Sequence, residues 1–236
     1  MHDAQVIVKA CSLSKHYGSI KALDGLDFEI RRGVILGLLG PNGSGKTTLL
    51  KAMCGMVRPT SGEVTLFGQK PSHSTKELVA YLPEIDYLYP WMSAAETVQF
   101  VSGFFRDWSA ERAQQLMEQL EIPARTKVRD LSRGLRARLK LVLALAREVP
   151  LVLLDEPLSG IDISSRAKII RAIVGEYRTG EQTIVLSTHQ VQESESIFEE
   201  VMFLRSGKIV LSDQAEHLRQ QHNCSIQDMW EKVYDR

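Results

Sequence analysis

The segment 40–48, GPNGSGKTT, constrains the fold of this chain more than any other feature. It fits the phosphate-binding pattern G-x-x-x-x-G-K-[ST], in which glycines let successive backbone N–H groups point into one concavity that holds a polyphosphate. The apolar run 34–39 before it predicts a short buried strand, and residues 48–53 after it predict a helix whose N-terminal end faces the phosphates. The residues expected to hold the phosphates are Gly40, Pro41, Asn42, Gly43, Ser44, Gly45, Lys46, Thr47 and Thr48.

Two side chains of this loop carry specific chemistry. Lys46 places a positive charge on the outer phosphates, and the Thr47 hydroxyl can ligate a Mg²⁺ ion that bridges them. The alternative is a glycine-rich turn that matches the pattern by coincidence. The strand before the loop and the helix after it favour a nucleotide site.

A second motif indicates what kind of nucleotide protein this is. The apolar run 151–154 is typical of a central parallel strand, and it ends in Asp155, Glu156 and Pro157. A carboxylate at the C-terminal end of such a strand lies on the ligand side of an open α/β sheet. Asp155 can hold Mg²⁺ through water, and Glu156 can take a proton from an attacking water. A solvated acidic turn is the alternative, but the strand and the upstream loop favour a catalytic pair.

From Tyr17 to His189 the chain resembles the ATP-binding subunit of an ABC transporter, with the motifs in that family's order. The resemblance implies that Tyr17, in KHYG, stacks on adenine and that His189, in LSTHQ, contacts the γ-phosphate. It also implies that Glu84, in AYLPE, contacts Mg²⁺ and relays to a membrane subunit, where the family more often has glutamine. The alternatives are a half-buried strand aromatic, a structural histidine and a surface glutamate.

The family signature, usually LSGGQ, corresponds here to LSRGL at 131–135. The resemblance implies that Ser132 and the Gly134 backbone approach the γ-phosphate held by a second copy. Asp162, in SGID, resembles the family's D-loop. Arg133 and Leu135 depart from the family pattern. Arg133 adds bulk, and its guanidinium can donate paired hydrogen bonds to phosphate or to a partner carboxylate.

Composition narrows the class of protein. The chain has 236 residues, 44% of them hydrophobic, and zero formal net charge, so it can bury a sizeable core but has no general basic field for nucleic acid. Three cysteines at no metal spacing fit a reducing compartment. A local basic cluster is either a solvated helix face or a flank of the signature that holds phosphate charge; its members are Arg133, Arg136, Arg138 and Lys140.

No apolar run approaches the roughly 20 residues that a membrane-spanning helix needs, and the first residues, MHDAQVIVKA, do not resemble a signal peptide. We therefore expect a cytoplasmic protein that is peripheral on the inner face of the cell membrane. In that arrangement a separately encoded transmembrane subunit forms the transport path.

Pattern changes along the chain predict one ABC ATP-binding domain over 1–236. Residues 1–90 and 149–236 read as an α/β core with a mainly parallel sheet and an N-terminal antiparallel β subdomain. Residues 91–148 read as an inserted helical subdomain, with Ser109 and Ser132 as helix N-caps and Pro123 ending the first of these two helices. A hairpin is expected over 201–211, and a short amphipathic helix around 226–230.

Together these features predict an ATP-hydrolysing transporter subunit in which ATP joins two copies and hydrolysis lets them part. A homodimer is favoured, because Glu156 and His189 are both intact, and a heterodimer with a related ATPase is the alternative. A small-metabolite kinase would share the phosphate loop without needing the signature, Asp162 and His189 together. A non-transport ABC ATPase acting on the ribosome, nucleic acid or an assembly scaffold is the other alternative. The sequence does not identify the transported substrate.

Overall fold

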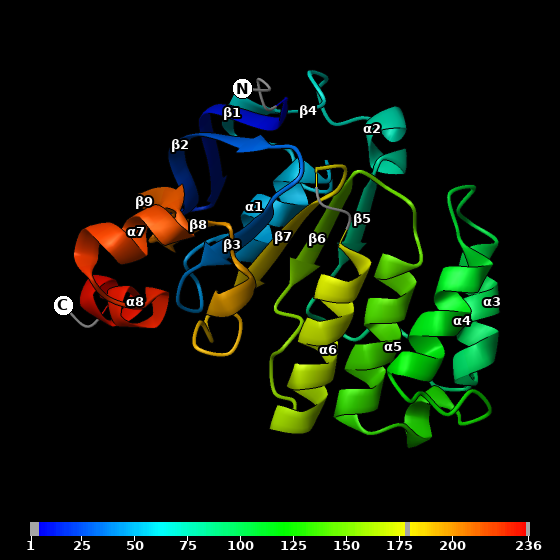
Figure 1. The fold of residues 1–236 in the computed structure, drawn as a ribbon. Coiled ribbons are helices and arrows are strands. Elements are labelled where there is room, and N and C mark those ends of the chain that lie inside the picture. The colour runs from blue at the N-terminus through cyan, green and yellow to red at the C-terminus, as the bar shows by residue number, and fades with distance from the viewer. Residues whose placement is uncertain (1–4, 178–179, 235–236) are drawn as a thin grey trace.

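The computed structural model describes residues 5–177 and 180–234, so the ends of the predicted 1–236 domain lie outside the described residues. Two sheets form the framework (Figure 1). The antiparallel sheet has the order β2-β1-β4, with β1 Val6–Tyr17, β2 Ile20–Arg31 and β4 Ser61–Leu66. The other sheet has the order β5-β6-β7-β3-β8-β9, with β5 Val79–Leu82, β6 Leu151–Asp155, β7 Thr183–Thr188, β3 Ile35–Leu39, β8 Glu200–Arg205 and β9 Lys208–Gln214. Only β9 runs antiparallel to its neighbour there, and with β8 it forms the predicted hairpin.

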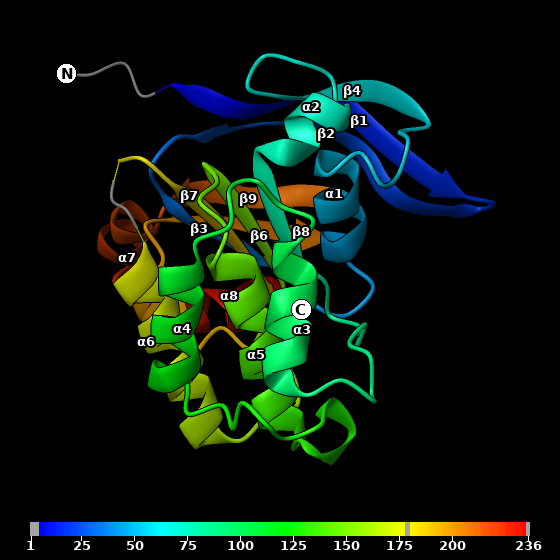
Figure 2. The ribbon, with the colours of Figure 1, turned by 90° about the vertical axis from the view of Figure 1, so that its right-hand side faces the viewer.

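Helices surround the larger sheet (Figures 1 and 2). Their bounds are α1 Lys46–Met53, α2 His73–Glu77, α3 Ala94–Ser102, α4 Ala110–Gln119, α5 Arg133–Leu145, α6 Ile163–Glu176, α7 Ala215–His222 and α8 Ile226–Tyr234, with short 3₁₀ helices at Val128–Asp130 and Glu195–Ile197. Ser109 and Ser132 cap α4 and α5, as the sequence predicts. The prediction that Pro123 ends α4 is wrong: the helix ends at Gln119, and Glu121 turns the chain with a φ of 52°.

The larger sheet separates two apolar cores, because alternate residues of a strand point to opposite faces. On β3, Leu36 and Leu38 pack with α1 and the antiparallel sheet, whereas Ile35 and Leu39 pack with α4, α5 and α6. Gly37 is needed on the second face, because a Cβ there would lie 2.8 Å from the Phe198 ring. This packing fixes β3 and α1, and therefore the loop between them.

Helices α3 to α6 lie together on one side of the sheet (Figure 2). Helix α5 is the central one, since it packs against α3, α4 and α6 and also against β5 of the sheet. The helix that begins at the signature is thus built directly onto the strand that leads to Glu84. Among the described residues, no helix is long and apolar enough to cross a membrane.

Candidate functional site

The loop between β3 and α1 is held by its own backbone. The Ser44 N–H donates to the Pro41 carbonyl at 3.2 Å, and the Gly207 N–H donates to the Ser44 carbonyl at 2.9 Å. Gly45 has a φ of 111°, and a Cβ there would lie 2.3 Å from the Ala22 carbonyl oxygen. Only glycine fits at this position, which explains why the pattern requires it.

A cavity of about 390 Å³ lies over this loop. It is lined by Ile20, Ala22, Asn42, Gly43, Ser44, Gly45, Lys46, Thr47, Thr48, Glu84 and Glu156. The structure therefore brings together the phosphate loop and two predicted acidic site residues that come from distant parts of the chain. The positive end of the α1 dipole also faces this cavity, which favours a bound anion.

Tyr17 lies outside this lining. It ends β1 and pairs across the hairpin with Ile20, which does line the cavity. The residue is 48% exposed, and the Lys15 ammonium lies 5.0 Å from the ring centroid. The structure places Tyr17 at the edge of the cavity with an accessible ring, so the predicted stacking on adenine stays a prediction.

Asp155 is fully buried at the end of β6, and three hydroxyl groups donate to its carboxylate. Their oxygens belong to Thr47 at 3.1 Å, Ser187 at 2.8 Å and Tyr81 at 3.1 Å. Burial, together with the Asp155 charge, raises the pKa of the Tyr81 phenol, which therefore stays protonated and donates. Sequence reasoning did not find Tyr81 or Ser187, which lie on the neighbouring strands β5 and β7.

Thr47 and Asp155 suit a magnesium ion. Both offer the hard oxygen ligands that Mg²⁺ takes, and they meet at the phosphate loop. Among the described residues there is no group of three or more His, Cys, Asp or Glu that could hold a metal ion alone.

The three predicted catalytic residues form one chain of contacts. Glu156 Oε1 lies 3.1 Å from Lys46 Nζ, and Glu156 Oε2 lies 2.9 Å from His189 Nδ1. Lys46 also donates to the Gly40 carbonyl at 2.6 Å, so it bridges the loop and the carboxylate. Glu156 has a φ of 48°, a left-handed backbone conformation that non-glycine residues adopt at a cost and that clusters at functional sites. The turn aims its side chain back toward the loop.

The signature residues lie apart from the phosphate-loop cavity and do not line it. Ser132 accepts a hydrogen bond from the Leu135 N–H at 3.2 Å as the N-cap of α5. Gly134 is buried against the start of α6, where a Cβ would lie 2.6 Å from Ser165 Oγ. Asp162 caps α6 through the Ser165 N–H at 2.9 Å, and hydrogen bonds from Ser165 lower the pKa of the Asp162 carboxyl. The signature and the D-loop thus pack on each other.

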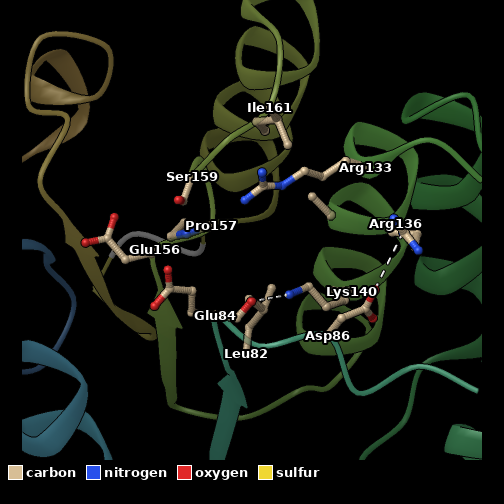
Figure 3. A pocket seen from close by; sticks show the side chains of 11 residues that line it. Leu82, Glu84, Asp86, Arg133, Arg136, Lys140, Glu156, Pro157, Ser159 and Ile161 are labelled. Carbon is tan, nitrogen blue, oxygen red and sulfur yellow. Dashed lines mark hydrogen bonds and ion pairs between the residues drawn. The ribbon is translucent and has the colours of Figure 1, made fainter. Parts of the chain in front are cut away.

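A second cavity of about 290 Å³ lies between α5 and the end of β6 (Figure 3). Glu84 and Glu156 line it as they line the first cavity. Arg133, Arg136 and Lys140 line it from α5, and Arg136 pairs there with Asp86 at 3.6 Å. Arg133 rests against Gly160, whose missing Cβ leaves room for the guanidinium.

The basic cluster is not one solvated helix face. Arg133 is exposed and Arg136 is half-buried, but Arg138 and Lys140 are buried. Arg138 donates to Ser165 Oγ at 2.6 Å and to the Leu120 carbonyl at 3.2 Å. The interpretation of the four residues as a solvated face is therefore wrong for the two buried members, which bind neighbouring segments of the protein.

Comparison with known proteins decides the family. The family model described as "ABC transporter" matches residues 23–159. The chain belongs to the ABC transporter family. A "Nod factor export ATP-binding protein I" from Ralstonia nicotianae is 33% identical over 95% of this chain and 72% of its own length. An uncharacterized ABC transporter ATP-binding protein, YxlF of Bacillus subtilis, is 30% identical over 91% of this chain and 73% of its own length.

One further relative is much longer than this chain, and two solved structures are similar in fold at lower sequence identity. The chain is 31% identical to the ABC transporter G family member 23 of Dictyostelium discoideum but spans only 34% of that protein. A solved ATP-binding subunit of an ABC transporter has a TM-score of 0.84 at 23% identity, covering 96% of this chain and 99% of that one. A second solved structure, a dimeric ATP-binding cassette in a post-hydrolysis state with ADP and Pi, has a TM-score of 0.77 at 24% identity, covering 88% and 98%. The predicted α/β fold and the predicted ABC ATPase family are confirmed.

Proposed function

We propose that this chain is the ATP-hydrolysing subunit of an ABC transporter and couples ATP-driven dimerisation to translocation by a separate membrane subunit. The observation that carries the proposal is the contact chain Lys46–Glu156–His189 beside Asp155 at the phosphate loop. Two relatives, of whose length the chain covers 72% and 73%, are named as ATP-binding proteins, one for Nod factor export and one of an ABC transporter. The first of these names supports an export system, and neither identifies the substrate of this chain.

Each site residue has a separate role in the proposed reaction. The loop N–H groups and Lys46 hold the phosphates and take up developing negative charge. Glu156 accepts a proton from the attacking water, while His189 holds Glu156 on one side and orients the γ-phosphate. Mg²⁺, held by Thr47 and Asp155 with Glu84 nearby, would neutralise phosphate charge. Tyr17 would supply a ring for adenine at the rim.

A second copy completes each site. Ser132, Gly134 and Asp162 do not line the phosphate-loop cavity of their own chain, and Ser132 and Asp162 are exposed, so this end of α5 can approach a nucleotide held by another copy. Ser132 keeps its hydroxyl proton for donation, because it accepts the Leu135 N–H through a lone pair. The similar cassette solved as a dimer with ADP and Pi supports this arrangement. We favour a homodimer, with a heterodimer as the alternative.

An apolar groove of about 360 Å³ fits the membrane subunit. It lies beside the Glu84 segment, and its apolar lining includes Met56, Ile85, Tyr87, Val101, Phe105 and Leu143. Next to it, exposed rings contact one another in the series Trp91, Tyr89, Phe100 and Phe104. A short apolar segment at the inner face of a transmembrane subunit has the matching chemistry, and would hold this chain at the cytoplasmic face of the membrane.

The purified chain should hydrolyse ATP in the presence of Mg²⁺ and stop when the metal is chelated, as a phosphate-release assay would show. Co-purification then separates the candidate functions. A polytopic membrane protein supports transport, whereas RNA or ribosomal particles would point to a non-transport ATPase. Absence of Mg²⁺-dependent hydrolysis at all protein concentrations would contradict the assignment as an active ATPase.

Glu84→Gln should keep ATPase activity in the isolated subunit and change mainly the stimulation by the membrane subunit. A carboxylate is as good an oxygen ligand for Mg²⁺ as an amide carbonyl, and it adds negative charge near the phosphates. The glutamine keeps an oxygen that can reach the metal and removes that charge. The measurement is ATPase rate against Mg²⁺ concentration, with and without the membrane partner. If neither Mg²⁺ dependence nor stimulation changes, Glu84 is only a surface residue.

A further inference from the structure

Two buried cations attach the signature helix to the two ends of β5. Lys140 Nζ, on α5, donates to three consecutive carbonyls at the C-terminal end: Pro83 at 3.1 Å, Glu84 at 2.9 Å and Ile85 at 3.1 Å. Arg147, just after α5, donates to the Glu77 and Val79 carbonyls at the other end, at 2.9 and 2.6 Å. Helix α5 and the residues just after it thus hold both ends of β5.

The segment 83–87 has no regular structure of its own and is largely exposed. The carbonyls of residues 83–85 accept hydrogen bonds from Lys140. Apart from hydrogen bonds within strands, no other donor among the described residues reaches them. An ammonium group has three N–H donors, so the three carbonyls satisfy it fully. Lys140 is 8% exposed, and burial lowers its pKa while the carboxylates of Asp86 and Glu84 oppose that shift.

The position of Glu84 gives this attachment a functional meaning. Its side chain lines the phosphate-loop cavity, while its carbonyl is fixed to α5 (Figure 3). The same helix is capped by Ser132, the residue expected to meet the nucleotide of a second copy. A displacement of α5 would therefore carry Glu84 with it, as long as Lys140 holds the segment.

We propose that Lys140 is a positioning residue that fixes Glu84 at the magnesium site by holding the 83–85 backbone on the signature helix. This inference rests on the proposed function, because it assumes that Glu84 approaches the metal of a bound nucleotide. Lys140 does not touch the nucleotide. It acts through Glu84, and it makes the 83–85 segment follow the signature helix.

The test compares Mn²⁺ binding to the ADP complexes of wild type, Lys140→Met, Lys140→Arg and the control Arg147→Lys, by electron paramagnetic resonance. Lys140→Met should weaken Mn²⁺ binding about tenfold, the lower end of the effect of losing a residue that orients a metal ligand. Lys140→Arg should have a Mn²⁺ affinity between those of Lys140→Met and wild type, because a planar guanidinium reaches fewer of the three carbonyls. Arg147→Lys should leave Mn²⁺ affinity unchanged, although it loosens the other end of β5.

Amide hydrogen exchange provides a second measurement. Exchange at residues 84–88 should accelerate in the Lys140 variants and not in Arg147→Lys. If Lys140→Met does not fold, the positioning role is tested with Lys140→Arg alone. Unchanged Mn²⁺ affinity in a folded Lys140 variant, or equal losses in Arg147→Lys, would overturn the positioning role. If wild type with ADP binds no Mn²⁺, the proposed function itself fails, and this inference with it.

Discussion

Glu156→Gln should lower the turnover of ATP by at least about a hundredfold, the loss typical of removing a general base, while ATP affinity stays near that of wild type. The carboxamide has the shape of the carboxylate. Its oxygen and nitrogen can take the places of the two carboxylate oxygens beside Lys46 and His189, so the shape of the site survives although the charge of the Lys46 ion pair is lost. What it loses is the capacity to take a proton from water. The measurements are steady-state hydrolysis and equilibrium nucleotide binding.

Glu148→Gln is the matched control, because Glu148 is an exposed glutamate between α5 and β6 that lines neither cavity. It should hydrolyse ATP like wild type. Because Glu156→Gln binds ATP without cleaving it, this variant should also accumulate as a dimer in ATP and not in ADP, as size-exclusion chromatography would show. Near-normal hydrolysis by Glu156→Gln would remove Glu156 from the proposed role as base.

The local features of the site are predictable from the sequence. The phosphate loop needs glycine where the φ is 111°, and the strand before Asp155 is a continuous apolar run. Ser109 and Ser132 cap helices in the structure as the cap preference predicts. Each of these depends on residues a few positions apart, where spacing and propensity act directly.

Contacts between distant segments are not predictable in this way. Ser187 reaches Asp155 because β7 pairs with β6 with these two residues in register, and Tyr81 reaches it from β5 on the other side. The sequence predicts the strands but not their order. The same limit applies to Lys140, whose partners lie more than fifty positions away. On the sequence it is one member of a basic run, and only the packing of α5 on β5 shows that it is buried.

Ser132→Arg should abolish ATP hydrolysis without reducing ATP binding, if the signature acts on the nucleotide of a second copy. The serine lies outside the phosphate-loop cavity of its own chain, so binding in that cavity should not depend on it. A large cation beside Arg133 at the start of α5 would prevent close approach of a second copy. For a homodimer, the hydrolysis rate of wild type should also rise more than linearly with protein concentration.

Ser132 also caps α5, so the substitution costs stability as well, about 1 kcal/mol for a lost N-cap. Ser109→Arg is the matched control, because Ser109 caps α4 in the same way, accepting from the Arg112 N–H at 3.2 Å, and is not part of the signature. It should lose similar stability and keep hydrolysis. Thermal unfolding, nucleotide binding and ATPase rates of both variants give the comparison. The contrary result is slow hydrolysis that is strictly linear in protein concentration and unaffected by Ser132→Arg. That result would indicate that the chain needs a different partner, or that a signature with Arg133 and Leu135 does not act on the nucleotide of a second copy.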